Sequence, residues 1–411
     1  MATLPFSHRA AWTAVALLWP VALLNYLDRQ IFATMKKSMM LGVPDIATEQ
    51  RFGQLMAIFL LVYGICSPVG GFLADRLNRR WVIIGSLGIW SMVTWLTGLS
   101  TTYHQLWWAR AAMGLSEACY IPAALALVAD FHHGVTRSRA VGLHQSGIYA
   151  GLILGGFGGY IADSSYGWSA GFTWFGLAGV LYSVVLFFFL RDAPRAERGS
   201  DPQGKVEVGP ALRELLGMKN FLLLVLYFTL PALAGWVVKS WMPAVLADTF
   251  QLGQGRAGLS ATLWVTLASF GGVLLGGFLA DYSVRQTVRG RIYVSALGVS
   301  LCIPALFGIG FAPSLLVAVL FLVLFGLGWG FFDANNMPIL CQIVRPELRA
   351  TGYGLMNLVS ITAGGWVVGK IGELRDAGTP SALIFGLCAG ASALGVVLVL
   401  LIRPRPALTP R

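Results

Sequence analysis

The chain has 411 residues, of which 56% are hydrophobic and only 11% are charged. Soluble globular domains carry about 25% charged residues, so this composition excludes an ordinary water-soluble enzyme. The net charge of +11 does not indicate a nucleic-acid partner, because Lys and Arg recur between apolar runs instead of gathering in one segment. Together with 50 Gly and 14 Trp, the composition predicts a polytopic membrane protein.

A helix that spans a membrane needs about 20 apolar residues, and twelve stretches of the chain can provide one. The first six lie near residues 11–34, 53–75, 81–100, 105–129, 138–163 and 169–190. The second six lie near residues 220–248, 257–281, 291–311, 314–343, 350–374 and 381–402. The fold class is therefore an all-α membrane protein, with twelve transmembrane helices in two six-helix bundles, residues 1–190 and 220–411.

The stretch 191–219 between these two sets contains three prolines and mixed charges, which predicts a connecting loop. The first apolar run lacks a small-residue cleavage site, so it is expected to stay as a span. Most Lys and Arg lie on the side of the N-terminus, and positive charge is retained in the cytoplasm. The linker and both termini are therefore expected to be cytoplasmic, in a cell membrane of the bacterial inner-membrane type. The opposite side holds Lys36, Lys37, Arg51, Arg256 and Arg375.

An internal repeat supports two related halves. The sequence Gly71–Asp75, GFLAD, recurs as Gly277–Asp281, and each copy ends a predicted span. Parallel halves related by an axis along the membrane normal place a substrate site near the midplane between them.

Glycines in the fifth predicted span recur every four residues and give a smooth stripe for close helix contact. Glycines in the eighth predicted span offer a possible partner surface. The two sets are Gly147, Gly151, Gly155 and Gly159, and Gly271, Gly272, Gly276 and Gly277.

The loop that follows the first copy of the repeat carries a family signature. Residues 71–80, GFLADRLNRR, resemble the G-x-x-x-D-R-x-G-R-R motif of the major facilitator superfamily, with Asn78 in place of the glycine. Asn is enriched among non-glycine residues in left-handed turns, so the change is compatible with the motif. The resemblance implies a gating latch between helix ends, and the alternative is a helix end with positive-inside arginines. The latch residues are Asp75, Arg76, Arg79, Arg80 and Arg139, with Asp281 and Arg285 in the second half.

Two further segments resemble one branch within this superfamily. Residues 25–29, NYLDR, and the pattern Arg110-x-x-x-Gly114-x-x-Glu117-Ala118 resemble the organic anion:proton symporter branch, which includes sialin and the hexuronate and galactonate permeases. Spinster-type lipid transporters share much of this pattern. The resemblance implies that Arg29 binds the substrate carboxylate and that Asp28 and Glu117 take part in proton coupling. The fifth span lacks the Gly-Pro element of antiporters, which favours symport or uniport.

The spacing of these residues supports a site without reference to a family. Ionisable groups inside a span cost about 2.5–3.5 kcal/mol each and mark ion or substrate pathways by default. Asn25, Asp28 and Arg29 follow helical spacing and share one face, and Arg110, Glu117 and Tyr120 do so in the fourth span. Protonation of Glu117 would then depend on whether an arginine is close. Structural ion pairs are the alternative.

Other polar residues inside predicted spans are candidate substrate ligands, and hydrogen bonding between helices is the alternative for each. Trp236 and Lys239 lie in the same predicted helix as the candidate Tyr227. Asp333 lies close in sequence to the candidates Asn335 and Asn336. The substrate-binding candidates are Asn25, Tyr26, Arg29, Arg110, Tyr120, His144, Gln145, Tyr149, Tyr227, Asn335, Asn336 and Asn357.

The function that these observations favour is proton-coupled symport of a small organic anion, a sugar acid or another carboxylate, by alternating access. The alternatives are a Spinster-like proton-coupled lysolipid transporter and a non-transporting membrane receptor. No metalloprotease, hydrolase or nucleotide-binding motif is present, so no enzyme is predicted. The five cysteines lack metal-ligand spacing, so neither a cofactor nor a metal is expected. The expected partners are protons, the anion and membrane lipid, without nucleic acid, and the expected state is a monomer.

Overall fold

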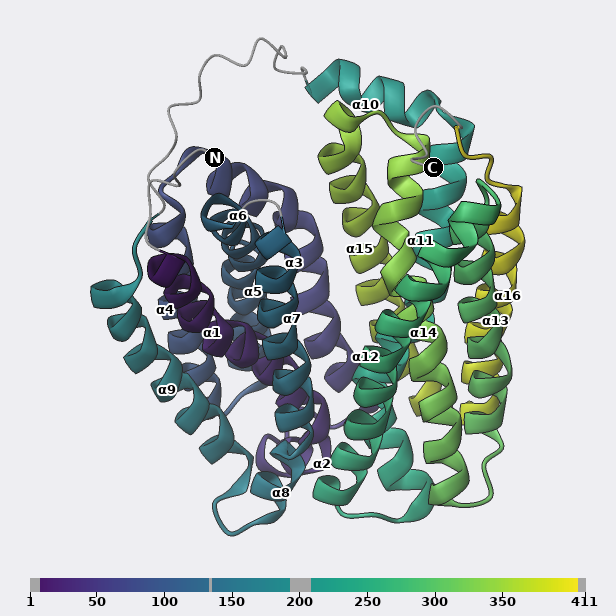
Figure 1. The fold of residues 1–411 in the computed structure, drawn as a ribbon. Helices are drawn as coiled ribbons and strands as arrows, with labels where there is room; N and C mark the ends of the chain where they lie inside the picture. The colour runs from purple at the N-terminus through teal and green to yellow at the C-terminus, as the bar shows by residue number, and fades with distance from the viewer. Residues whose placement is uncertain (1–7, 133–134, 193–207, 406–411) are drawn as a thin grey trace. The chain divides into compact units, whose positions relative to one another are not determined.

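A computed structural model describes residues 8–132, 135–192 and 208–405, and every regular element in these ranges is a helix (Figure 1). The helices up to residue 192 are α1 (His8–Thr34), α2 (Lys36–Gly42), α3 (Glu49–Arg76), α4 (Arg79–Gly98), α5 (Tyr103–Glu117), α6 (Tyr120–Phe131), α7 (Val135–Gly156), α8 (Gly158–Asp163) and α9 (Gly167–Phe189). Those after residue 207 are α10 (Val208–Gly217), α11 (Lys219–Phe250), α12 (Gln254–Gln286), α13 (Gly290–Gly310), α14 (Leu315–Ile343), the 3-10 turn η1 (Pro346–Leu348), α15 (Arg349–Asp376) and α16 (Ser381–Leu401).

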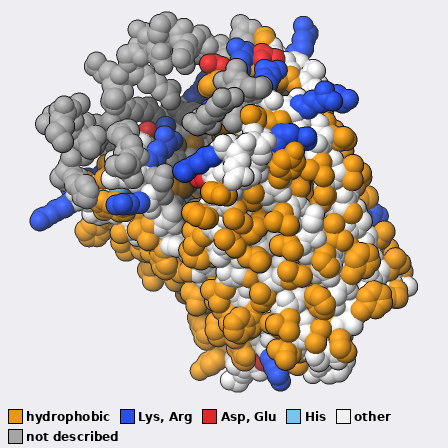
Figure 2. All heavy atoms as spheres, turned by 45° about the vertical axis from the view of Figure 1, so that its right-hand side comes forward, with side chains coloured by type: hydrophobic (Ala, Val, Ile, Leu, Met, Phe, Trp, Pro, Cys, Tyr) orange, Lys and Arg blue, Asp and Glu red, His pale blue; other side chains and the backbone are white. Residues whose placement is uncertain are grey.

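The twelve predicted spans all fall on helices. Ten helical segments among the described residues are long and apolar enough to cross a membrane. The two predicted spans that are missing from this set correspond to α7 with α8, and to α15. These helices carry polar side chains such as His144, Gln145 and Asn357, which lower their hydropathy. Hydrophobic side chains cover most of the face in Figure 2, and Lys and Arg lie mainly toward its ends.

The chain divides into two compact units, each of which takes a short segment from the other half of the sequence. Unit 1 consists of Met1–Ala47, Ile58–Pro202 and Gly253–Leu259. Unit 2 consists of Thr48–Ala57, Gln203–Leu252 and Ser260–Arg411.

Unit 1 is built around the contact between α1 and α7. Gly147 and Gly151 lie against the backbone carbonyl oxygens of Trp19 and Leu23, and neither leaves space for a Cβ atom. Gly147, Gly151 and Gly155 of the predicted glycine stripe therefore pack against α1, and Gly159 lies against Gln254 of the α12 segment in the same unit. The expected partner surface in the eighth span packs elsewhere, since Gly272 lies against α14. Apolar residues from α1, α4 and α6, including Leu18, Leu87, Trp90 and Leu127, form the core.

A segment of α12 completes unit 1. The Gln254 side chain donates to Asp163 Oδ1 at 2.9 Å and to Ser38 Oγ at 2.6 Å. The backbone N–H of Gly255 donates to the other Asp163 oxygen at 2.9 Å. These bonds anchor Gly253–Leu259 to α8 and α2.

Unit 2 packs α11, α13, α14, α15 and α16 around a second apolar core, which includes Phe221, Leu224, Ile339 and Met356. The predicted loop 191–219 is wrong in its last part, because α10 is a helix whose Ala211 and Leu215 join this core. Burial of apolar residues one turn apart explains why this short segment is helical. Residues 193–207 of the predicted linker lie outside the described residues.

The fourth predicted span, 105–129, is interrupted where the sequence predicted one helix. Helix α5 ends at Glu117, and α6 begins at Tyr120. Pro122 lacks an N–H group and cannot donate to the carbonyl of Ala118, so the helical ladder is broken at that point. The side chain of Ser86 also donates to the Ser116 carbonyl at 2.6 Å. The break places Glu117 at a helix end.

The turn after α3 also differs from expectation. Asn78 precedes α4 with φ −67° and ψ 117°, which is an extended conformation and not a left-handed one. Among the described non-glycine residues, a positive φ occurs at Gln251, the C-cap of α11. Asn78 is therefore accommodated because this turn does not require a glycine conformation.

Candidate functional site

The candidate site in unit 1 begins with the polar face that the sequence predicted on α1. Asn25 and Asp28 are 0% and 1% exposed, and Arg29 follows them on the same helix. Residues three and four apart are neighbours on a helix surface, so the three side chains point in a common direction. The Arg29 Nη2 atom donates to Asn25 Oδ1 at 3.2 Å. Helix α1 therefore presents a guanidinium that its own preceding turn orients.

The partner of this guanidinium is Glu117, the last residue of α5. Arg29 Nε donates to Glu117 Oε2 at 2.7 Å, and the two side chains are 12% and 0% exposed. A carboxylate with no exposure is tolerated because the adjacent guanidinium compensates its charge. The structure brings together two residues that the sequence placed on separate predicted helices.

Aromatic rings surround both arginines. The Arg29 guanidinium lies over Tyr26, Phe59 and Tyr63, with its Cζ atom 4.8, 5.0 and 4.4 Å from the three ring centroids. Arg110 lies over Phe59 and over a second ring, that of Phe32, each at 4.4 Å. Phe59 thus contacts both guanidiniums. Cation–π contacts within about 6 Å of a centroid are attractive, and more strongly so where water is excluded.

The second acid of the site, Asp28, lies beside α4. Thr94 Oγ1 donates to Asp28 Oδ2 at 3.2 Å. Asp28 Oδ1 and Glu117 Oε1 are buried and have no hydrogen-bond partner among the described residues. Asp28, Arg110, Glu117 and Arg29 act electrostatically on one another. The arrangement contains two acids and two guanidiniums, and each acid retains one oxygen on which a proton can reside.

The remaining unit 1 candidates fall into two groups. Tyr120 and His144 are fully buried and bond to each other at 2.9 Å, and the tyrosine hydroxyl donates to the Leu18 carbonyl at 3.0 Å. Gln145 is exposed, and Tyr149 is half-buried. Direct contact of Tyr120 or His144 with a ligand would require this internal bond to open. Their assignment as substrate ligands stays a prediction.

The predicted ligands in unit 2 are similarly divided. The Tyr227 hydroxyl bonds Ser295 Oγ at 2.5 Å, and Asn335 donates to the Phe331 carbonyl at 2.8 Å. Asn336 is 2% exposed, and neither its amide nitrogen nor its oxygen has a partner among the described residues. Asn357 is half-buried. Asn336 therefore differs from its neighbours in having unused hydrogen-bonding capacity.

The predicted latch residues in unit 1 have partners that the motif alone does not identify. Arg79 pairs with Asp130 and donates to the Ala126 carbonyl at 3.1 Å. Arg80 donates to the Phe187 carbonyl, and Arg76 lies over the ring of Phe72. Arg139 is exposed. The side chain of Asp75 lies outside the described part of the structure.

In the second copy of the motif, Asp281 pairs with Arg291 of α13 at 3.3 Å. Arg285, the residue predicted from the motif, lies in the last turn of α12 and is exposed. The latch role of both copies stays a prediction.

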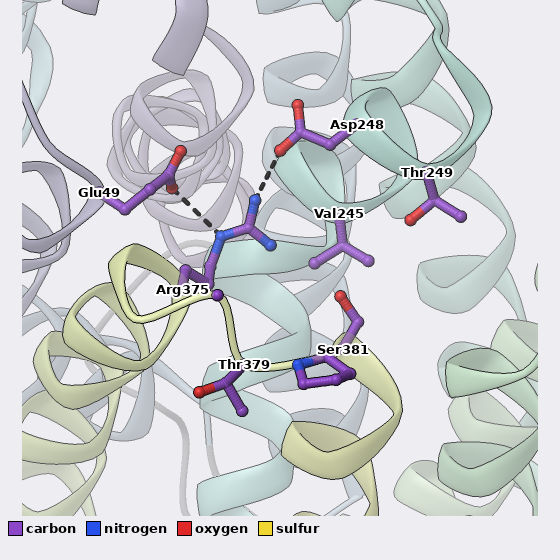
Figure 3. Close-up of a pocket in the computed structure, with 9 residues that line it drawn as sticks. Glu49, Val245, Asp248, Thr249, Arg375, Thr379 and Ser381 are labelled. Atoms are coloured by element: carbon purple, nitrogen blue, oxygen red, sulfur yellow. Dashed lines mark hydrogen bonds and ion pairs between the residues drawn. The ribbon is translucent and has the colours of Figure 1, made fainter.

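Sequence reasoning missed a charged cluster in unit 2. Arg375, near the end of α15, donates to Glu49 Oε2 at 3.2 Å and to Asp248 Oδ2 at 2.5 Å (Figure 3). Asp376 accepts from the backbone N–H groups of Glu49 and Gln50 at 2.9 and 2.8 Å. Glu49, Asp248 and Arg375 line a pocket of about 380 Å³. They are distant in sequence, so local spacing contains no signal for the cluster.

No group of three or more His, Cys, Asp or Glu residues within the described ranges is arranged to hold a metal ion. All five cysteines are free. The ion pair and the two carboxyl oxygens without a partner among the described residues allow ion pairing and proton exchange at the unit 1 site.

An all-helical chain with buried charges inside apolar helices is a multi-pass membrane protein. The model of the Major Facilitator Superfamily matches residues 18–369. The chain belongs to this superfamily of membrane transporters, as its fold and its loop motif indicated.

Spinster-type proteins are among its relatives. Protein spinster homolog 1 of Bos taurus is 30% identical over 432 residues, covering 93% of this chain and 78% of the relative. Protein spinster of Drosophila melanogaster is 26% identical over 384 residues. The alignment covers 89% of this chain but only 62% of the Drosophila protein, so the chain matches under two thirds of that relative.

A solved structure confirms the fold. A bacterial homolog of the human lysosomal transporter Spinster, in an inward-facing and unoccupied conformation, superposes with a TM-score of 0.79. It is 21% identical, and the match covers 97% of this chain and 96% of that one.

Proposed function

We propose that this transporter is a proton-coupled symporter of a small organic anion, with Arg29 as the ligand of the substrate carboxylate. The observation that supports the proposal is the ion pair between Arg29 and the unexposed Glu117, at 2.7 Å. An internal carboxylate occupies the guanidinium that an external carboxylate would need. The two anions therefore compete for one cation.

Protonation of Glu117 resolves this competition. A neutral carboxylic acid binds a guanidinium more weakly than a carboxylate does, so the proton frees Arg29 for the substrate. The Oε1 atom of Glu117, which has no hydrogen-bond partner among the described residues, gives the proton a place, and Asp28 offers a second one through its Oδ1 atom. When one proton moves with one monovalent anion, no net charge crosses the membrane, so the membrane potential does no work on the pair. The pH gradient then drives the transport, and each pH unit supplies about 1.4 kcal/mol, which can concentrate the anion about tenfold.

The proposal includes an orientation and a set of partners. The excess of Lys and Arg on one side supports cytoplasmic termini. The membrane in this proposal is a bacterial inner membrane. Protons, the anion and the surrounding lipid are the partners of a monomeric carrier.

The test uses proteoliposomes that contain a pH-sensitive dye. Addition of a sugar acid such as D-glucuronate or D-galactonate should acidify the lumen when the protein is wild type. Glu117→Gln should abolish this acidification and uphill accumulation, while counterflow exchange of labelled substrate continues. Loss of both activities in a folded Glu117→Gln protein would contradict a role restricted to protons.

A second candidate function is favoured by the 30% identity to spinster homolog 1. In this alternative, the substrate is a lysolipid, and Arg29 binds its headgroup phosphate. The rings of Tyr26, Phe59 and Tyr63 around the guanidinium would then contact the apolar part of the lipid. Lysophospholipid translocation without sugar-acid uptake in the same liposomes would select this function over the first.

A further inference from the structure

Unit 2 contains a lysine in the interior of a span. Lys239 lies in α11 and is the sole basic residue between Lys219 and Arg256. A charged side chain at such a position marks a functional site by default, because burial in hydrocarbon is costly. Nothing in the ion pair of unit 1 uses it.

Two indole rings hold the ammonium group. Lys239 Nζ lies 5.4 Å from the ring centroid of Trp236 and 5.0 Å from that of Trp329. Both distances are within the range of cation–π attraction. Trp329 is fixed by stacking against Phe325, with centroids 6.1 Å apart, and by Phe332 at 5.3 Å.

Glycines of neighbouring helices complete this arrangement. Trp236 of α11 lies against Gly364 of α15, and Trp329 of α14 lies against Gly235 of α11, so closely that neither glycine can accept a Cβ atom. The two rings therefore rest on the backbone of two helices, α15 and α11. Close packing of this kind fixes the faces of the two indole rings before a ligand binds.

Polar groups lie on the same face of α14. Trp329, Asp333 and Asn336 are spaced by four and three residues, which aligns them on a helix. The charge of Lys239 acts on Asp333. Lys239 is half-buried and Asp333 is exposed, so a ligand can reach both. Asn336 is 2% exposed and retains two unpartnered amide atoms among the described residues.

We propose that Lys239, Trp236 and Trp329 form a second anion subsite within unit 2, separate from the position at Arg29, which takes a carboxylate or a phosphate of the transported molecule with flat hydrocarbon surface beside it. The anion competes with the charge of Asp333 for Lys239, and the adjacent C–H surface packs on the indole faces. Asn336 supplies an amide on the same helix face for a ligand oxygen. This inference rests on the proposed function, since it requires that the transported molecule be an anion.

The competition between Asp333 and the ligand gives two variants opposite effects. Lys239→Gln should weaken anion binding by about tenfold or more, because a charge-assisted hydrogen bond is lost. Lys239→Arg should stay within about threefold of wild type. Asp333→Asn should tighten binding, because it removes the internal competitor of the anion. A purely structural ion pair predicts that Lys239→Gln and Asp333→Asn weaken binding alike.

The experiment is isothermal titration calorimetry on the full-length protein in lipid nanodiscs. D-glucuronate and 1-oleoyl lysophosphatidate are titrated separately, so that a free carboxylate and a lipid phosphate are distinguished. Lys370→Gln is the matched control, since Lys370 pairs with Glu373 on the surface of α15 at 2.7 Å. The control should bind like wild type, and thermal unfolding should confirm that every variant is folded.

The outcomes separate this inference from the proposed function. If Arg29→Ala abolishes binding while Lys239→Gln leaves the affinity unchanged, the subsite is wrong and the proposed function stands. If Asp333→Asn weakens binding as much as Lys239→Gln, the pair is structural and the subsite is again wrong. If wild type binds neither probe, both the anion substrate and the subsite are overturned.

Discussion

The interiors of the two units show different uses of charge in a chain whose halves repeat. In unit 1, Arg29, whose side chain is 12% exposed, pairs with the unexposed Glu117, and a second arginine and a second acid lie beside them. In unit 2, Lys239 lies against the rings of Trp236 and Trp329, and its charge acts on Asp333. The repeated sequence GFLAD is retained at the helix ends, but the interior residues are not. The repeat is therefore seen at the helix ends, while the charged residues inside the two units differ.

The strongest test of this difference removes the arginine of unit 1. Arg29→Ala should lower substrate transport by about 100-fold or more, because the substrate ligand is lost and Glu117 becomes an unpaired buried charge. Uptake of labelled substrate into proteoliposomes measures the effect.

Loss of folding is separated from loss of binding by a second variant. Arg29→Ala combined with Glu117→Gln removes the orphaned charge, so thermal stability should recover while transport stays absent. Recovery of transport in the double variant would contradict the role of Arg29 as a substrate ligand.

Helix packing in unit 1 should be the next most sensitive feature. Gly151→Ala places a Cβ against the Leu23 carbonyl, where the rigid backbone cannot yield, and should lower the free energy of unfolding by about 1–3 kcal/mol. Gly277→Ala of unit 2 is the matched control, because no atom lies within 4 Å of its added Cβ. Equal melting temperatures for the two variants in detergent would show that α1 and α7 are not closely packed there.

A smaller effect is expected from the ring between the two guanidiniums. Phe59→Leu keeps apolar volume but removes cation–π contacts to Arg29 and Arg110, each of which contributes about 0.5–2 kcal/mol. The substrate KM should change by several-fold, with a smaller change in maximal rate. Phe59→Tyr retains the ring and should behave like wild type. A leucine variant with unchanged KM would exclude a positioning role for the ring.

The smallest effect is expected at the second copy of the loop motif. Arg291→Gln breaks the pair with Asp281, whose side chain is 71% exposed, so stability should change by less than about 1 kcal/mol. Thermal unfolding of the variant provides the measurement. A large loss of stability would show that this end of unit 2 is held by charge.

The positions of the helices could be predicted from sequence because membrane spans must satisfy their own backbone hydrogen bonds and therefore appear as long apolar runs. The break between α5 and α6 after Glu117 was not predicted, although Pro122, which has no N–H group to donate, is visible in the sequence and causes it. The α10 helix was missed because prolines and charges around it outweighed the apolar pair Ala211 and Leu215.

The candidate site was predictable only in part. Spacing placed Asp28 with Arg29 and Glu117 with Arg110, and the family resemblance linked the two helices. The contacts of Lys239 with Trp236 and Trp329 could not be predicted together, because Trp329 is far from Lys239 in sequence and no helical spacing connects the two residues. The cluster around Arg375 was missed for the same reason, since its acids come from α3 and α11.

The exchange of short segments between the units bears on protein engineering. A cut in the linker separates the coding sequence into two halves, but neither half encodes a whole unit. The first fragment lacks Gln254, whose side chain bonds Ser38 and Asp163, and the second lacks Glu49, a partner of Arg375. Co-expression of both fragments is therefore the appropriate form of a split transporter, and reporter fusions to one fragment alone would measure an incomplete fold.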